Sequence, residues 1–160
     1  MEKDSELLRL VESESEAERG QAAADPDLPI ELQKKLGYDE SDWVREQLAS
    51  NLRLADFLRL GMVRKETSLA VAKALLSTAA PRFRGAVWTA AMQSDVGAEL
   101  RSWRGRAKLC PTPEKRKYRT EAQAIASGDG GQRGLTLFHY ECLCGLWHNT
   151  RRSQDFAVTV

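Results

Sequence analysis

Cysteine, histidine and aromatic residues are scarce in this chain of 160 residues, which has three Cys, two His and an aromatic content of 7%. So few cysteines exclude a disulfide-dense scaffold, and we expect them to be reduced thiols. No apolar run approaches the roughly 18–20 residues that span a bilayer, which argues against a membrane protein. The opening MEKDSELLRL lacks the basic start and apolar core of a signal peptide. We therefore expect a soluble, cytoplasmic protein.

The net charge of +1 conceals a gradient along the chain. Residues 1–60 contain 8 Lys/Arg and 15 Asp/Glu, residues 61–100 contain 5 and 3, and residues 101–160 contain 11 and 5. The N-terminal part is therefore acidic and the C-terminal part basic. Such asymmetry predicts two functional parts, with nucleic acid or another acidic partner for the basic one. The alternative is solvated surface charge that happens to be polarised.

From residue 5 to about residue 100 the sequence is typical of helices. Asp25-Pro26-Asp27 interrupts the first helical stretch, and Pro29 suits the first turn of a helix that ends at Gly37. Residues 39–42 offer capping oxygens for the next helix, and two more helices are expected at about 67–79 and 81–92. The apolar stripe expected for the helix after residue 42 is Trp43, Val44, Leu48 and Leu52.

The helical half also contains an internal repeat. Residues 16–25 align with residues 42–51 at an offset of 26, with identical Arg, Gln and Ala. Asp42-Trp43-Val44-Arg45 resembles the Asp-x-x-Val-Arg helix of leucine-rich-repeat-variant and HEAT-like helical repeats. The resemblance covers about residues 13–60 and implies stacked helix pairs with extended faces for partners. An ordinary small helical bundle is the alternative. Catalytic motifs such as a phosphate loop or HExxH are absent from this half.

Every Cys and His of the chain lies within 39 positions of its C-terminal third. A structural zinc ion takes four such ligands in a tetrahedron, commonly Cys3His. The predicted ligand set is Cys110, Cys142, Cys144 and His148. His139 is the competing fourth ligand, but strand alternation over residues 135–142 places it opposite Cys142, so we favour His148. Three buried cysteines without a metal are the alternative.

Three segments carry a further resemblance: Cys110-Pro111, residues 117–122 and residues 140–150, the last reading YECLCGLWHNT. Together they resemble a zinc-ribbon family of short actinobacterial and bacteriophage proteins, whose tail often reads Tyr-x-Cys-x-Cys-Gly-x-Trp-His-x-Thr. The resemblance covers about residues 108–152 and implies zinc bound by the three cysteines and His148. It also implies a phage-like origin, with the host cytoplasm as the location. Four protein ligands close the coordination shell, so we expect structural Zn2+ and no enzyme.

A basic segment surrounds the first cysteine. Residues 101–119 contain 8 Lys/Arg and one acidic residue, Glu114. The interleaved Trp103 and Tyr118 could stack on bases while the cations hold phosphates. The alternatives are contact with an acidic protein and docking onto the chain's own acidic helices. The predicted nucleic-acid-binding residues are Arg101, Trp103, Arg104, Arg106, Lys108, Lys115, Arg116, Lys117, Tyr118, Arg119, Arg151 and Arg152.

The sequence thus predicts a mainly α fold in which a helical, HEAT-like repeat precedes a small α+β zinc-ribbon module. The expected parts are a helical domain (1–100), a basic linker (101–109), the zinc-ribbon module (110–152) and a tail (153–160). In the module we expect strands at 115–118 and 135–142 and a helix at 120–127. The predicted function is that of a non-enzymatic regulatory or adaptor protein, whose module contacts DNA or RNA and whose helices contact a protein. A pure protein–protein interaction module that modulates a host complex is the alternative.

Overall fold

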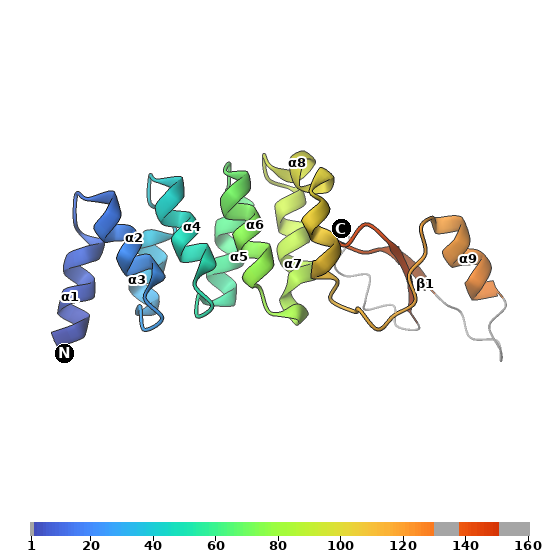
Figure 1. Cartoon of the computed structure of the whole chain (residues 1–160), viewed down its shortest axis with the longest axis horizontal. Helices are drawn as coiled ribbons and strands as arrows, with labels where there is room; N and C mark the ends of the chain where they lie inside the picture. Colours follow the sequence, from blue (N-terminus) through green and yellow to red (C-terminus); the bar gives the residue numbers. More distant parts are fainter. Residues whose placement is uncertain (1, 130–137, 151–160) are drawn as a thin grey trace.

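The structure is a computed structural model that describes residues 2–129 and 138–150. The expectations for Arg151, Arg152, the start of the second strand and the tail lie outside the described residues. A row of helices leads into a small module with a β-hairpin (Figure 1). The predicted mainly α fold with a small α+β part is confirmed. The helices of the row are α1 (Glu2–Val11), α2 (Glu16–Ala24), α3 (Ile30–Leu36), α4 (Asp42–Ser50), α5 (Asp56–Arg64), α6 (Leu69–Thr78), α7 (Pro81–Met92) and α8 (Gly97–Ser102).

The helices form an open, two-layered array. In one layer α2 packs on α4 and α4 packs on α6, while α5 and α7 pack together behind them (Figure 1). Each helix contacts near neighbours in the chain, so the core runs along the whole row rather than around one centre. This is the arrangement of a helical repeat, not of a closed bundle. No helix in the described ranges is long and apolar enough to cross a membrane.

The 26-residue repeat of the sequence is visible in the equivalent helices α2 and α4. The side chains of Ser15 and Ser41 cap their first turns by accepting hydrogen bonds from backbone N–H groups three residues on. At the other ends, the backbone N–H groups of Asp25 and Asn51 donate to carbonyls in the last turn. Both helices therefore begin and end at matching positions, as the alignment predicts.

The predicted apolar stripe of α4 is only half right. Val44 and Leu48 are fully buried, but Trp43 is 42% exposed and Leu52 is 80% exposed. Leu52 lies beyond the end of α4, in the loop to α5. Trp43 lies against α2, where a Cβ atom on Gly20 would come within 2.1 Å of its ring. Glycine at position 20 thus makes room for an aromatic ring on the surface between two repeats.

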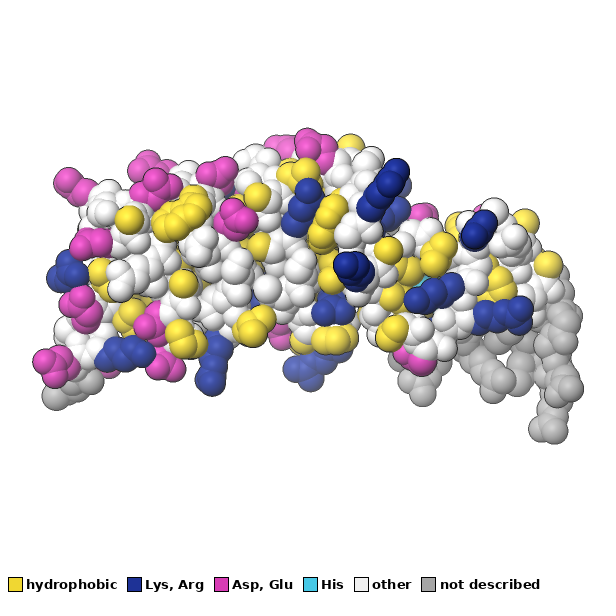
Figure 2. Space-filling model, viewed as in Figure 1, with side chains coloured by type: hydrophobic (Ala, Val, Ile, Leu, Met, Phe, Trp, Pro, Cys, Tyr) yellow, Lys and Arg dark blue, Asp and Glu magenta, His cyan; other side chains and the backbone are white. Residues whose placement is uncertain are grey.

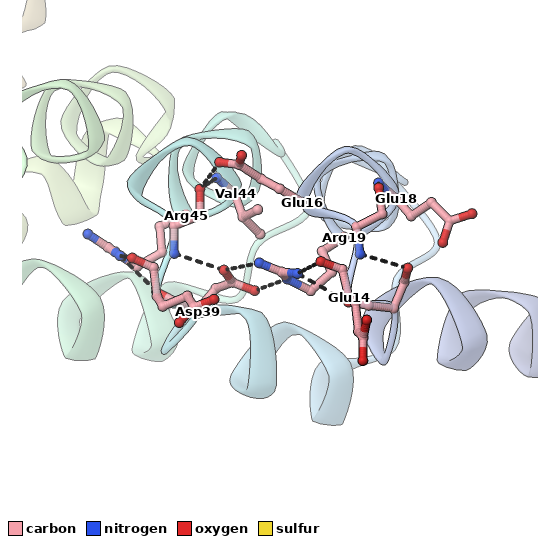
Figure 3. Close-up of polar contacts among 11 residues, drawn as sticks. Glu14, Glu16, Glu18, Arg19, Asp39, Val44 and Arg45 are labelled. Atoms are coloured by element: carbon pink, nitrogen blue, oxygen red, sulfur yellow. Dashed lines mark hydrogen bonds and ion pairs between the residues drawn. The ribbon is translucent and has the colours of Figure 1, made fainter.

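An arginine connects the first two repeats at the N-terminal ends of α2 and α4. Arg19 donates from Nε to Asp39 Oδ2 at 2.7 Å and from Nη2 to Oδ1 at 3.2 Å. Its Nη1 also donates to the backbone carbonyls of Ser13 and Glu14 at 3.1 and 3.0 Å (Figure 3). Both partners of this bidentate pair are largely shielded from solvent.

The same arrangement recurs one repeat later. Arg45 donates to both carboxylate oxygens of Glu66, at 3.1 and 3.0 Å, and to the carbonyls of Asp39 and Glu40, at 2.7 and 3.2 Å. Asp39 therefore accepts from Arg19 through its side chain and from Arg45 through its backbone (Figure 3). The two arginines form a ladder that fixes the spacing of three successive repeats.

A buried cation holds the opposite ends of these helices. Arg59 on α5 is almost completely inaccessible, and its guanidinium donates to the carbonyls of Ala49 and Leu75 at 3.2 and 3.4 Å and to the Thr78 hydroxyl. These acceptors lie at the C-terminal ends of α4 and α6, where unpaired carbonyls and the helix dipoles favour a positive charge. Desolvation by burial lowers the pKa of Arg59.

The C-terminal module contains α9 (Glu121–Asp129) and a hairpin of β1 (Phe138–Glu141) and β2 (Trp147–Thr150). The α9 helix confirms the predicted one, and the Thr120 hydroxyl accepts from the Gln123 N–H in its first turn. The strand expected at 115–118 shortens to a single bridge between Tyr118 and Trp147. Two backbone hydrogen bonds, of 2.9 and 2.8 Å, form that bridge.

The segment predicted as a basic linker is helical. Arg101 and Ser102 end α8, and Arg104–Leu109 form the 3₁₀ helix η1. The buried Leu109, Leu143 and cysteines join the same apolar core as the helical array. The module is thus packed onto the end of the array.

The substitution Arg59→Met tests the buried cation. Methionine keeps the apolar stem but removes the donors, so the free energy of unfolding is expected to fall by about 3 kcal/mol because the helix-end carbonyls lose their partner. Arg53→Met, at an exposed position of the preceding loop, is the control and should change it by less than about 0.5 kcal/mol. Denaturation followed by circular dichroism measures both. Equal stabilities of the two variants would contradict this role.

Candidate metal centre

Four side chains converge at the contact between η1 and the hairpin. The ligand atoms of Cys110, Cys142, Cys144 and His148 all lie within 4.8 Å of one another, and all four residues are buried. Cys110 Sγ lies 3.9 Å from Cys142 Sγ and 3.5 Å from His148 Nε2. Cys144 Sγ lies 3.7 Å from the same nitrogen. The structure thus brings together the four residues predicted from the sequence, in a cluster that could bind one metal ion.

The turn of the hairpin presents two of the thiols. Cys142 and Cys144 lie between β1 and β2, where the Cys142 N–H donates to the Leu146 carbonyl at 2.9 Å and the Gly145 N–H donates to the Cys142 carbonyl at 2.8 Å. Gly145 has φ +82, the left-handed region that favours glycine. A Cβ atom there would also meet the Arg106 guanidinium at 2.9 Å. Glycine at 145 therefore permits both the tight turn and the close approach of Arg106.

His148 is oriented by a second contact. Its Nδ1 lies 3.0 Å from the Arg116 carbonyl, so Nδ1 carries the proton and donates it to that oxygen. Nε2 then directs its lone pair at the thiols, as an outer-shell partner does for metal-bound histidines. Sequence reasoning missed Arg116 in this role, because the acceptor is a backbone carbonyl that any residue carries.

His139, the competing ligand, lies outside the cluster. Its Nε2 is 3.3 Å from Glu121 Oε1, and its ring lies 6.2 Å from that of Trp147. The register of the hairpin explains this, because His139 and Asn149 form a pair next to that of Tyr140 and His148. Neighbouring pairs in a hairpin point to opposite faces.

The neighbouring thiols of Cys142 and Cys144 shift each other's pKa in opposite directions. A hydrogen bond from the Cys142 thiol lowers the pKa of the Cys144 thiol. The same hydrogen bond, and to a lesser extent burial, raises the pKa of the Cys142 thiol. One thiolate is therefore favoured without any ion, and a divalent cation would take the place of the proton that the pair shares.

Most of the predicted basic residues lie on η1 and on the loop between Cys110 and α9. Arg106 lies 5.2 Å over the Trp88 ring and donates to the Leu143 carbonyl at 3.4 Å, so it joins the hairpin to α7. Lys115 lies 5.4 Å from the Tyr140 ring. Six further cations form no ion pair with any carboxylate in the ranges 2–129 and 138–150. These unpaired cations are Arg101, Arg104, Lys108, Arg116, Lys117 and Arg119.

The two aromatic side chains of the basic segment have partners within the protein. The Trp103 ring lies 5.6 Å from Lys73 Nζ and packs on the apolar core, and a Cβ atom on Gly105 would come within 2.5 Å of the ring. Arg116 lies 5.5 Å over the Tyr118 ring. Neither side chain is fully exposed.

The acidic and basic parts lie at opposite ends of the molecule. Asp and Glu side chains gather over the N-terminal helices in Figure 2, and Lys and Arg side chains over α8 and the module. The basic segment packs on the α7–α8 end of the array, where Leu109 joins the buried core and Arg106 lies over the Trp88 ring. Comparisons with protein-family models, curated proteins and solved structures find no match, so the resemblance to zinc ribbons stays a prediction.

The two histidines provide a matched test of the metal centre. His148→Gln removes one of the four ligands. We expect it to weaken the binding of zinc by more than about 100-fold, because losing an outer-shell partner alone weakens metal binding by about 10- to 100-fold. His139→Gln leaves the cluster intact and should retain the affinity of the unaltered protein. Competition against a chromogenic zinc chelator measures both. An equal loss in the two variants would contradict the assignment of His148.

Proposed function

We propose that the Cys3His cluster is a structural zinc site. Tetrahedral zinc with bonds of about 2.3 Å to sulfur and 2.0–2.1 Å to nitrogen sets its ligands about 3.8 Å apart for a sulfur pair and about 3.6 Å for a sulfur–nitrogen pair. The observed 3.9 Å between Cys110 and Cys142, and 3.5 and 3.7 Å from His148 Nε2 to the thiols, match these values. Four protein ligands leave no position for substrate, which supports a non-enzymatic role.

We further propose that this zinc-bound module contacts nucleic acid. The observation that carries the proposal is that six cations without an ion pair in the described part of the chain lie together within residues 101–119. Among the described residues of the array, Lys3, Arg9, Arg19, Lys34 and Lys35 are paired, whereas Arg53 and Arg64 are not. A group of uncompensated Lys and Arg is the electrostatic signature of a phosphate-binding surface. The helical array, in this view, serves as the adaptor part.

The metal site supports the same proposal by fixing the basic loop in place. The loop begins at Cys110, its Arg116 carbonyl accepts from His148, and Tyr118 pairs with Trp147 of β2. Both ends of the loop thus depend on the hairpin that zinc would close. A rigid loop presents its cations without the entropy cost of ordering them on binding.

Exposed apolar side chains support a protein partner for the array. Tyr38 is 74% exposed, Leu52 80% and Phe57 56%. The extended open faces of a helical repeat are typical contact sites for partners. The exposed side chains equally support the second candidate, in which the whole chain is a protein-interaction module with structural zinc and no nucleic-acid contact.

Charge reversal separates the two candidates. The triple change Arg104→Glu, Lys108→Glu and Lys117→Glu is expected to weaken binding to a mixed-sequence DNA or RNA duplex by more than about 100-fold at 0.1 M salt, because three phosphate contacts are lost. Fluorescence anisotropy across a salt series measures the affinity.

The control makes the same change of charge in the array, at Arg53, Arg64 and Lys65, and should keep most of the affinity. Zinc content and circular dichroism verify that both variants are folded. Equal affinities of the two variants would favour the pure protein-interaction module.

A further inference from the structure

We infer that the basic surface recognises double-stranded nucleic acid through its phosphates alone, without base stacking or sequence readout. This inference rests on the nucleic-acid contact proposed above and narrows it to a class of ligand and a mode of binding. It follows from which side chains the fold leaves available on the module and which it uses internally.

The aromatic rings are occupied within the protein. Cations of the protein lie 5.2–5.6 Å from the rings of Trp88, Trp103, Tyr118 and Tyr140, and the His148 ring lies 5.7 Å from that of Tyr140. Proteins that bind single strands depend on exposed rings on which successive bases stack. Phe138, at 37% exposed, is the most accessible aromatic side chain in the described module, and one ring does not make a stacking platform.

The available groups are the unpaired cations on α8, on η1 and on the loop after Cys110. Without stacking, affinity comes from charge, and a duplex carries about one phosphate charge per 1.7 Å of axis against about one per 3.4 Å for a single strand. A surface of this kind therefore favours the duplex. Sequence readout would require a helix or a pair of strands that enters a groove and bonds to base edges. The η1 helix is only six residues long, and its Leu109 is buried in the core of the array, so η1 is too short and too firmly packed to lie along a groove.

The acidic end of the array limits the length of nucleic acid that the protein can contact. Glu14, Glu16, Glu40 and Asp42 are carboxylates at the N-terminal ends of α2 and α4, and none of them pairs with a cation in the described part of the chain. They repel a polyanion, so the duplex is held at the module end only (Figure 2). The site is therefore short, and the array remains free for another partner.

The test measures the affinity of the full, zinc-loaded protein for four fluorescent probes of equal length. These are an AT-rich DNA duplex, a GC-rich DNA duplex, an RNA duplex and single-stranded oligo(dT). We expect the two DNA duplexes to bind within about twofold of each other and oligo(dT) at least about fivefold more weakly. With six cations in contact, the slope of log K against log salt should be about −5 for the duplexes.

Two single variants distinguish charge from stacking. Lys117→Gln should reduce the magnitude of that slope by about 0.9, whereas Phe138→Ala should leave affinity and slope unchanged. Zinc content confirms that both variants are folded. Tighter binding of oligo(dT), a tenfold preference between the DNA duplexes, or a larger effect of Phe138→Ala would overturn the inference and leave the nucleic-acid contact standing.

An acidic peptide of matched charge is the last probe. Weaker binding of this peptide than of the duplexes supports the inference. If the peptide binds as tightly as the duplexes, or if no nucleic acid binds in a salt-dependent manner, the proposed nucleic-acid contact itself fails and an acidic protein becomes the partner.

Discussion

The C-terminal module depends on the contact between Cys110 and the hairpin that carries the other three ligands. The strands of that hairpin are four residues long each, too short to bury a core of their own. Modules of this size are held together by a metal or by disulfides, because the cost of lost chain entropy exceeds the free energy that their apolar contacts contribute. Cys110 ends η1 and thus belongs to the helical array. The same cluster therefore closes the module and joins it to the array.

In the array, side chains provide hydrogen-bond partners for the backbone groups at the helix ends, which an open stack leaves without partners within their own helix. Arg19 and Arg45 take up carbonyls and carboxylates at one edge, and Arg59, with Asn51 and Thr78, takes up carbonyls at the other. Because each of these side chains reaches into a neighbouring repeat, the hydrogen bonds that complete one helix also position the adjacent one. Short helices of about nine residues can then stack without long loops.

The two ends of the molecule differ in charge. Acidic side chains gather over the N-terminal helices, and six cations without a carboxylate partner in the described residues lie within residues 101–119, on both sides of Cys110 (Figure 2). Two cation–π contacts stabilise the junction: Arg106 of the basic segment lies over the Trp88 ring of α7, and Lys73 of α6 lies over the Trp103 ring of the basic segment. These two rings are therefore engaged by cations of the same chain.

Composition, periodicity and spacing were enough to predict the helical array, its 26-residue repeat and the four side chains of the candidate metal site, because helix caps, apolar patterns and metal ligands are properties of residue types at short range. The exposure of Trp43, the helical form of residues 104–109 and the reduction of the 115–118 strand to one bridge depended on what lies across the fold. The assignment of Nε2 as the ligand atom of His148 also depends on the fold, because the Arg116 carbonyl accepts the proton of Nδ1. Only packing brings together groups 32 residues apart, and it decides whether a ring faces solvent or a cation of the same chain.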